Sequence, residues 1–419
     1  MKSFDAVVIG AGPAGSSTAI LLARVGWSVA LVERQRFPRR KVCGECVAAS
    51  NLPLLDALGI GDAFARLAGG ELRRVALMHG GETIVASLPP AEASPYRYGR
   101  ALGREHLDTL LADQAEAEGV VRFQPWALQS IDGSAGRFDV RLQPGGGGGG
   151  GDASTLRASL VVAAHGSWEP LPSERPALRC ARRPSDLFAF KANFRETAIA
   201  ADLLPVLSFR GGYGGMVVAD DGLATLACCI REDRLGRDRV DRPGERAGDV
   251  VEKILRRECA GVDAALAAAT REGAWLATGP IRPGVRLGAG DAVFRIGNAA
   301  GEAHPIVGEG ISMALQSAFV LASLIGSERA SLVNPQTAAV AQRRLMKTYQ
   351  GLWRQRFATR LRVAAAFAHV AMRPVAARSL WPVARRWPSL LTLGARWSGK
   401  TRCAPEAARL AASSSFVAD

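Results

Sequence analysis

The segment from Phe4 to Glu33 reads FDAVVIGAGPAGSSTAILLARVGWSVALVE, and it decides the fold of this 419-residue chain. An apolar strand comes first, a glycine-rich turn follows at residues 10–15, and an apolar helix and a second strand lead to Glu33. The acid stands 23 residues after the first glycine, as in a dinucleotide-binding strand–helix–strand unit. The glycines in this context predict a Rossmann-like domain.

Each glycine of this turn has a predicted physical role. Gly10 allows the tight turn, Gly12 lets the backbone approach a pyrophosphate, and Gly15 lets helix and strand pack closely. The helix N-terminus presents free N–H groups and a positive dipole end to the phosphates. Glu33 can accept hydrogen bonds from a ribose, which favours a cofactor without a 2′-phosphate. The alternative is a glycine-rich turn in an ordinary strand–helix–strand unit.

Length and composition indicate a large core, organised as two joined lobes. No apolar run of about 18 residues or more occurs, which predicts no transmembrane helix. The cofactor strand begins at once, which predicts no signal peptide. The seven cysteines are odd in number and scattered, as suits a reducing compartment. We therefore expect a cytoplasmic protein, with peripheral contact at the inner face of the membrane as a further expectation.

Positive charge is concentrated near the C-terminus. Residues 341–402 hold 14 Lys and Arg and no Asp or Glu, which equals the net charge of +14 for the whole chain. Basic helices with tryptophans can lie on anionic membranes, so this segment predicts peripheral membrane contact or capture of a lipid-like substrate. The alternative is helices that pack their aromatic residues on the body and solvate their arginines. No reader motif accompanies the charge, so no nucleic-acid partner is expected.

The rest of the chain reads as alternating helices and strands. Residues 103–118 predict a helix, and 160–164 predict a strand buried on both faces. Strand-like runs with turn signals between residues 187 and 230 predict an antiparallel sheet that roofs the cofactor. A buried strand at 291–296 then leads to glycines that open a long apolar helix ending near Ile325. Seven glycines at 145–151 predict a flexible hairpin tip.

Three motifs together resemble the FAD-dependent superfamily of p-hydroxybenzoate hydroxylase and geranylgeranyl reductase. They are GAGPAG at 10–15, GREHLDTLL at 103–111 and GNAAG…HPIVGEGI at 297–311. The resemblance spans about residues 4–330, and KVCG at 41–44 and GEGISMALQS at 308–317 look most like the geranylgeranyl reductase branch. It implies FAD as the cofactor and an α/β (α+β) fold.

The resemblance also implies the domain organisation. A discontinuous Rossmann-like FAD-binding domain would comprise residues 1–73, 100–180 and 278–330. An interleaved antiparallel β-sheet substrate domain would comprise 74–99 and 181–277, and a basic, tryptophan-containing helical region would follow at 331–419.

Matching positions imply the cofactor contacts. The pyrophosphate would lie on the first glycine turn and Arg104, the ADP ribose on Glu33, and the adenine near the backbone of Leu128. The third motif would contact the ribityl chain, the pyrophosphate and the isoalloxazine. The full set of implied FAD contacts is Gly10, Gly12, Ala14, Gly15, Glu33, Arg104, Leu128, Gly297, Asn298, Ala299, Pro305, Gly308, Gly310 and Ile311.

Two positions depart from the family pattern. Asn298 replaces the acid of the family's G-D motif, and its amide can still donate and accept hydrogen bonds. His165 replaces the acid of the D-G motif, which helps to hold FAD and to handle nicotinamide. Both changes bear on FAD retention, and the second bears on the electron donor, for which NAD(P)H or a reductase partner is expected.

The cofactor would supply the hard chemistry, and two reactions remain open. We favour a flavin monooxygenase acting on a hydrophobic aromatic, polyketide or isoprenoid-like small molecule, because the reductases' Y-x-W-x-F-P signature is absent and residues 212–215 occupy its place. The W-x-W-x-I-P motif of flavin halogenases is also absent, which argues against halogenation. A flavin-dependent alkene reductase of a prenyl or lipid substrate is the alternative. A non-catalytic or maturation flavoprotein is the third.

Few side chains are candidates for catalysis. His304 precedes Pro305, so the resemblance puts it near the flavin, in a proton-transfer role or in a structural hydrogen bond. Cys43 and Cys46 form a CxxC motif that could line the substrate pocket or form a redox disulfide. A zinc site would need a second ligand pair, so no metal is expected. Two cysteines without a covalent role are the alternative, and Tyr213 is a weaker candidate.

Overall fold

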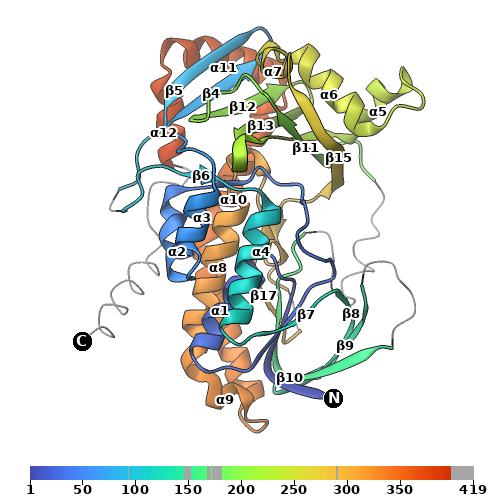
Figure 1. The fold of residues 1–419 in the computed structure, drawn as a ribbon, viewed down its shortest axis with the longest axis vertical. Coiled ribbons are helices and arrows are strands. Elements are labelled where there is room, and N and C mark those ends of the chain that lie inside the picture. The colour runs from blue at the N-terminus through green and yellow to red at the C-terminus, as the bar shows by residue number, and fades with distance from the viewer. Residues whose placement is uncertain (93, 146–151, 168–170, 172–181, 289–290, 398–419) are drawn as a thin grey trace.

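The computed structural model describes residues 1–92, 94–145, 152–167, 171, 182–288 and 291–397. Two β-sheets lie one above the other along the long axis, with a helical layer beside the lower sheet (Figure 1). The predicted α/β fold with an interleaved second sheet is confirmed.

The first sheet contains the strand that opens the chain. Its order is β7-β2-β1-β10-β9-β8, and β17 also pairs with β10. β1, β2, β7, β10 and β17 run parallel, whereas β8 and β9 form an antiparallel flap. The bounds are β1 Lys2–Ile9, β2 Val29–Val32, β7 Val121–Phe123, β8 Trp126–Ser134, β9 Arg137–Pro144, β10 Ser154–Ala163 and β17 Phe294–Arg295. The last strand is thus shorter than the predicted 291–296.

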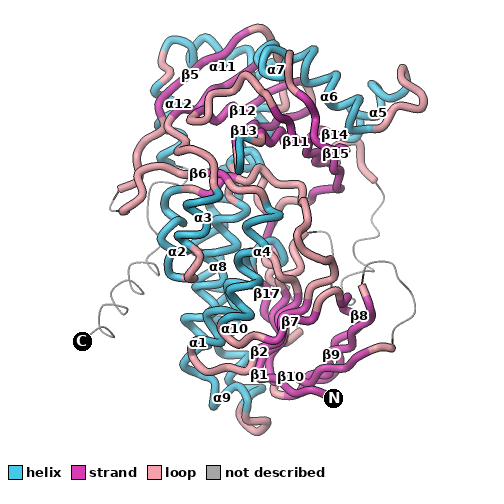
Figure 2. The backbone as a smooth tube through the Cα atoms, in the orientation of Figure 1, coloured by secondary structure: helices cyan, strands magenta, loops and turns pink. Residues whose placement is uncertain are grey.

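A helical layer gathers beside this sheet, as the cyan segments of Figure 2 show. Helix α1 packs against α4 and α8, and α8 packs against α10. The bounds are α1 Pro13–Arg24, α2 Leu52–Ala57, α3 Gly61–Leu67, α4 Arg104–Ala117, α8 Gly310–Ile325, α9 Arg329–Val333 and α10 Ala338–Ala371. The stretch Gly310–Val333 is long and apolar enough to cross a membrane by length and composition alone, but 67% of its most apolar window is buried in the structure, as in a core helix.

The second sheet draws its strands from two separate parts of the chain. Its order is β15-β11-β14-β13-β12-β4-β5, antiparallel except where β12 runs parallel to β4. The bounds are β4 Arg74–His79, β5 Glu82–Ser87, β11 Leu187–Arg195, β12 Leu203–Phe209, β13 Gly212–Val218, β14 Ala224–Arg231 and β15 Thr270–Ile281. The predicted antiparallel roof is therefore present, whereas the exact domain boundaries stay a prediction.

Helices α5 (Glu232–Val240), α6 (Ala247–Glu258) and α7 (Ala260–Leu266) follow β14. Apolar residues of α6 and α7 pack on one face of the second sheet. Short two-stranded ladders complete the connections: β3 (Cys46–Val47) with β6 (Arg100–Ala101), and β16 (Gly284–Val285) with β18 (Gly301–Glu302).

The C-terminal segment continues from α10 into α11 (Pro374–Arg386) and α12 (Ser389–Trp397). One face of α10 is buried at four-residue intervals, at Leu345, Tyr349, Trp353, Phe357 and Leu361. For this helix the alternative is therefore correct that its aromatic residues pack on the body of the protein. By contrast, Trp387 on the α11–α12 connection is 55% exposed.

Candidate functional site

The glycine turn between β1 and α1 has the geometry that its sequence predicts. Gly10 has a φ of +105°, a backbone conformation that residues other than glycine rarely adopt. A Cβ on Gly15 would lie 1.8 Å from the Gly10 carbonyl oxygen, so this helix–turn contact requires glycine. A Cβ on Gly12 would meet only an Nη atom of Arg104, at 3.5 Å. The backbone of the turn at Gly12 is therefore accessible to a ligand on the side where Arg104 lies.

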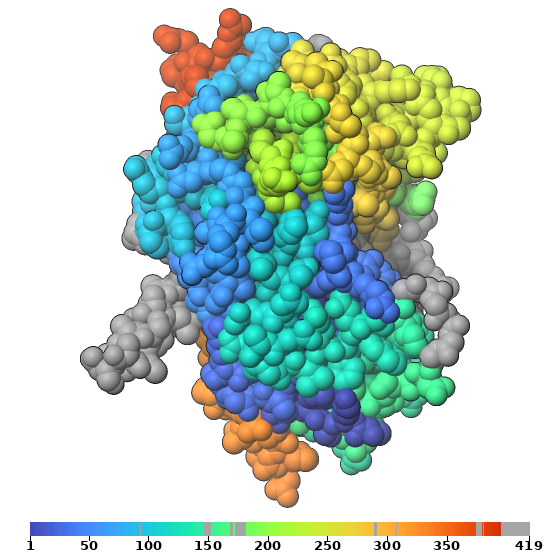
Figure 3. Space-filling model, viewed as in Figure 1, coloured from blue at the N-terminus to red at the C-terminus, as the bar shows by residue number. Residues whose placement is uncertain are grey.

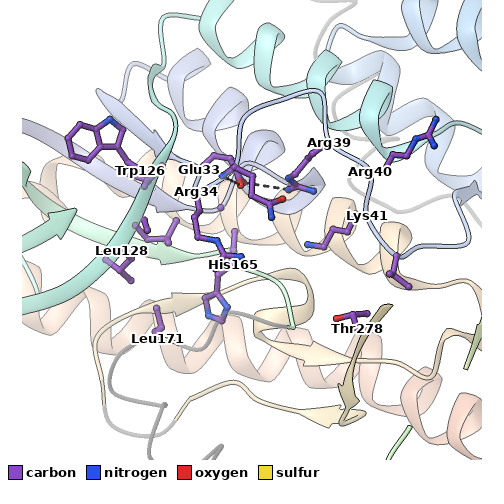
Figure 4. A pocket seen from close by; sticks show the side chains of 18 of the residues that line it. Glu33, Arg34, Arg39, Arg40, Lys41, Trp126, Leu128, His165, Leu171 and Thr278 are labelled. Atoms are coloured by element: carbon purple, nitrogen blue, oxygen red, sulfur yellow. Dashed lines mark hydrogen bonds and ion pairs between the residues drawn. The ribbon is translucent and has the colours of Figure 1, made fainter. Parts of the chain in front are cut away.

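A cavity of about 620 Å³ extends from this turn along the carboxyl ends of β1 and β2 (Figure 4). Glu33, Leu128 and His165 line it, and Trp126 lies on the side away from Arg40. The Glu33 carboxylate accepts hydrogen bonds from the backbone N–H groups of Ala11 at 3.0 Å and Gln35 at 2.9 Å. Four residues of the implied FAD contacts, Gly10, Gly12, Glu33 and Leu128, line this cavity. We call it the adenosine-end cavity, after the part of FAD that the sequence assigns to Glu33 and Leu128.

Basic side chains meet beside the glycine turn. Arg104 donates two hydrogen bonds to Asp108, at 2.7 and 2.8 Å, and Arg39 pairs with the same carboxylate at 3.2 Å. Lys41 lies among them, and burial together with the charges of Arg104 and Arg39 lowers its pKa to about 8. An anion at this point would relieve the repulsion between these cations.

A second cavity, of about 260 Å³, begins on the other side of the turn. Gly12 and Lys41 line both cavities, so the two meet there. The second sheet contributes Tyr213 and Met216 to the far wall of this flavin-end cavity. Of the predicted cofactor contacts, it brings together Gly12, Ala14, Arg104, Asn298, Pro305, Gly308, Gly310 and Ile311.

The loops after β10 and β17 meet at Asn298. Its side-chain amide donates to the Ser167 hydroxyl at 2.9 Å, so the residue that replaces the family's acid holds two loops together. Gly15, Gly297 and Ala299 lie behind the cavities rather than in their walls. Gly297 has a φ of +55°, and its N–H donates to the Ser317 hydroxyl at 2.9 Å. The direct cofactor contacts of these three residues stay predictions.

Both cysteines of the CxxC motif line the flavin-end cavity, and neither forms a disulfide bond. The Cys43 sulfur accepts a hydrogen bond from the Glu45 N–H at 3.3 Å and interacts with Arg104. Within the described part of the chain, no group of three or more His, Cys, Asp or Glu could hold a metal ion. The location suits the predicted pocket-lining role, whereas a redox role stays a hypothesis.

His304 lies behind the flavin-end cavity, next to residues that line it. Its Nδ1 shares a hydrogen bond with the Tyr213 hydroxyl at 3.2 Å, and its ring centroid lies 6.2 Å from that of His369. Burial, with a smaller contribution from His369, lowers the pKa of His304 to about 4. The imidazole is therefore neutral near pH 7, and a structural hydrogen bond accounts for its setting.

Sequence reasoning missed a buried ion pair beneath the cavity. Lys191 on β11 and Glu45 of the CxxC loop form this pair, and both side chains are fully buried. Thr225 donates to the other Glu45 oxygen, and the Arg104 N–H donates to Glu45 at 2.9 Å. The signal was present in the run FAFKANF, where Lys191 and Asn193 interrupt an otherwise apolar strand.

The donor groups around the two cavities fit FAD. The adenosine-end cavity and the flavin-end cavity meet at a glycine turn with three nearby cations, as a molecule with two ring systems joined by a pyrophosphate requires. Gly12, Lys41 and Arg104 would hold the pyrophosphate. Glu33 and Leu128 would lie at the adenosine, and the loop from Pro305 to Ile311 at the flavin.

Comparison with known proteins agrees with this geometry. A family model described as FAD binding domain matches residues 3–350. The kynurenine 3-monooxygenase of Salinispora arenicola is 27% identical over 338 residues, 75% of this chain and 71% of that protein. The menaquinone reductase of Mycobacterium tuberculosis is 37% identical over 120 residues, 28% of each chain. The tryptophan 2-halogenase of Chondromyces crocatus is 35% identical over 123 residues, 29% of this chain, so the chain spans only 23% of that halogenase.

Solved structures show the same fold at low sequence identity. The myxobacterial chondrochloren halogenase CndH matches with a TM-score of 0.72 and 19% identity, over 98% of this chain and 96% of that chain. PqsL of P. aeruginosa in complex with 2-aminobenzoylacetate matches with a TM-score of 0.66 and 19% identity, over 88% and 95%. The chain therefore belongs to the FAD-binding-domain family of flavin-dependent monooxygenases and halogenases, with menaquinone reductase among its relatives.

Proposed function

We propose that the chain is an FAD-dependent monooxygenase acting on a hydrophobic aromatic, polyketide or isoprenoid-like small molecule. The observation that carries the proposal is the flavin-end cavity, whose wall opposite the glycine turn comes from the second sheet. The residues that this sheet contributes, Tyr213, Met216 and Ile281 among them, carry no charge, whereas the charged lining residues of the cavity come from other elements. Relatives named kynurenine 3-monooxygenase and 6-methylpretetramide 4-monooxygenase support an aromatic or polyketide-like substrate.

Reduced FAD, when bound, would supply reactivity toward molecular oxygen. The residues of this chain would position the substrate and exclude water. The Tyr213 hydroxyl, whose pKa burial raises well above its usual value, stays protonated and can donate a hydrogen bond. His304 is neutral and fixes this hydroxyl through their shared hydrogen bond. Electrons would come from NAD(P)H or from a separate reductase.

The proposal can be tested in a single turnover without knowledge of the natural electron donor. The FAD-loaded protein is reduced with dithionite under nitrogen and mixed with labelled oxygen and a panel of substituted phenols and anthranilates. We expect products that carry one labelled oxygen atom, detected by mass spectrometry. Oxidation of the flavin without labelled product from any member of the panel would contradict the proposal.

An alkene reductase is the second candidate. The KVCG and GEGI segments and the 37% identity to a menaquinone reductase over 120 residues favour it. The same reduced protein, held without oxygen and mixed with prenylated quinones, would then give a product with two added hydrogens. Halogenation is favoured by the 35% identity to a tryptophan 2-halogenase over 123 residues, but the missing W-x-W-x-I-P motif argues against it. The likeness to halogenase structures at 19% identity concerns the fold alone.

A non-catalytic or maturation protein that keeps the fold is the third candidate, prompted by Asn298 and His165. It is separated from both enzymes by titration with FAD. A protein that stays colourless in excess FAD would favour it, whereas we expect a yellow protein after gel filtration.

A further inference from the structure

A third cavity, of about 590 Å³, lies between the second sheet and the C-terminal helices. Its walls are the β4 residues Val75 and Leu77, the β12 residues Leu204 and Val206, and apolar side chains of α10, α11 and α12. This volume falls within the usual range of ligand sites, roughly 300–1,000 Å³. We refer to it as the tail chamber.

The tail chamber joins the flavin-end cavity. Five residues line both: Cys46, Leu204, Val206, Ile306 and Gly308. The two cavities are therefore adjacent, with Ile306 and Val206 in the wall that they share. The adenosine-end cavity shares none of these five residues, so the chamber lies on the substrate side rather than the nucleotide side of the flavin position.

The other end of the chamber opens at the surface. Several of its lining side chains are exposed, among them Phe367 at 50%, Val383 at 39% and Leu390 at 43%. Arg97 and Arg360 are the basic side chains among the described lining residues. Arg360 donates to the Gln316 side chain at 3.0 Å and lies 3.7 Å from Glu309, so its charge is compensated. The chamber is thus a largely apolar cavity that begins at the surface and ends beside the flavin-end cavity.

We propose that the tail chamber binds the apolar tail of the substrate while its head lies in the flavin-end cavity. The substrate is then an amphiphile with a flat head and a long alkyl or prenyl chain. An apolar chain would be removed from water by Val75, Leu77 and the α10–α12 residues. The identity of the head as an aromatic ring rests on the proposed function.

A homologous series of 4-n-alkylphenols with chains of two, six and ten carbons tests the inference. Binding to the FAD-loaded protein is measured by calorimetry below the critical micelle concentration. Each buried methylene contributes roughly a threefold gain in affinity, so we expect at least a tenfold gain from ethyl to hexyl. Affinity that does not change with chain length, or no binding by any member, overturns the inference.

Two variants assign the gain to this chamber. Val75→Trp fills it from β4, and we expect the chain-length gain to disappear while ethylphenol binds as before. Leu77→Phe is a milder change on the same strand and should reduce the gain. Val85→Trp is the matched control, since Val85 is 44% exposed on the neighbouring strand β5 and lies outside the chamber. A gain that persists in Val75→Trp overturns the assignment.

Because the readout is binding, the inference and the proposed function fail separately. A chain-length gain without oxygenated product leaves the tail chamber supported and removes the monooxygenase. Oxygenation of short phenols without a chain-length gain supports the monooxygenase and removes the tail-binding role of the chamber.

Discussion

Lys41 is a cation at the junction of two cavities, beside two arginines. An FAD pyrophosphate at the glycine turn would pair with it. We expect Lys41→Met to weaken FAD binding by roughly tenfold or more, because a hydrogen bond to a charged group contributes about 1.5–3 kcal/mol. The measurement is titration of the apoprotein with FAD, followed by flavin fluorescence.

The pH dependence of FAD binding separates a direct contact from a structural effect. The pKa of Lys41 is about 8 in the free protein, and a bound pyrophosphate would raise it. FAD affinity should therefore decline as the pH rises from 7 to 9, and Lys41→Met should lose this decline. Arg36→Gln, an exposed change in the same loop, is the control that should leave both properties unchanged. Identical pH profiles for wild type and Lys41→Met would contradict the assignment.

His304 should account for part of the loss of folding stability at acid pH. Its pKa is about 4 in the folded protein, against an ordinary value of 6.5. Between these values the unfolded chain binds a proton that the folded protein excludes, so stability falls as the pH drops from 6.5 toward 4. We expect His304→Gln to remove roughly 1–2 kcal/mol of the loss between pH 7 and pH 5, after allowance for solvent screening.

Urea unfolding at the two pH values measures this effect. His106→Gln, at a half-exposed histidine on α4, is the control variant. Equal acid sensitivity of His304→Gln and wild type would show that His304 titrates normally in the folded protein.

At the scale of elements, one buried ion pair joins the CxxC loop to strand β11. Burial raises the pKa of Glu45, although Lys191 and two hydrogen bonds oppose this effect. Removing one partner leaves the other charge buried, so we expect Glu45→Gln to destabilise the protein by about 3–5 kcal/mol. The double variant with Lys191→Met should recover a large share of this loss.

Urea unfolding of both single variants and the double variant gives the coupling energy. The matched control is Arg74→Gln, which breaks the exposed pair of Arg74 and Asp202 at 2.6 Å and should cost less than about 1 kcal/mol. If Glu45→Gln costs no more than this control, the pair does not hold the CxxC loop to strand β11.

The elements that were predictable from sequence are those whose signals lie within a short stretch of neighbouring residues. The turn from Gly10 to Gly15, helix α4 and the glycines that precede α8 each follow from residues close together in the chain. Contacts between distant segments were not predictable. Glu45 and Lys191 are 146 positions apart, and the parallel pairing of β4 with β12 joins two segments that are far apart in the sequence.

The candidate site divides in the same way. The glycine turn and Glu33 line the predicted nucleotide cavity, because a motif fixes its own geometry. Leu128 lines the same cavity, and only the family resemblance implied its place there. The tail chamber was not predictable, since its walls come from β4, β12 and three C-terminal helices that only tertiary packing brings together. The predicted glycine hairpin tip lies largely outside the described residues, because the structure does not describe 146–151.

At the scale of the whole molecule, basic and apolar groups share one end. Trp387, Leu390 and Leu393 are exposed there, beside Arg385 and Arg386 (the red segment near β5 in Figure 3). We expect the protein to float with anionic phosphatidylglycerol liposomes at low salt and to bind less as salt rises, because exposed charges are screened.

Charge reversal tests which end is responsible. Arg385→Glu with Arg386→Glu should abolish flotation at low salt. Arg137→Glu with Arg141→Glu, on strand β9 at the opposite end of the molecule, is the matched control and should float as wild type does. No flotation of the wild type at either salt concentration removes the membrane proposal.

Helix α10 has 34 residues and is therefore about 50 Å long. It packs on α8 beside the first sheet, and it also contacts β13 of the second sheet and the turn at Pro305–Val307. A single long helix thus contacts both the helical layer beside the first sheet and the second sheet. Hinge opening of the two halves would break its packing at both contacts. We therefore expect molecules to reach the flavin position through small displacements of α11 and α12, with the two sheets held at a fixed separation.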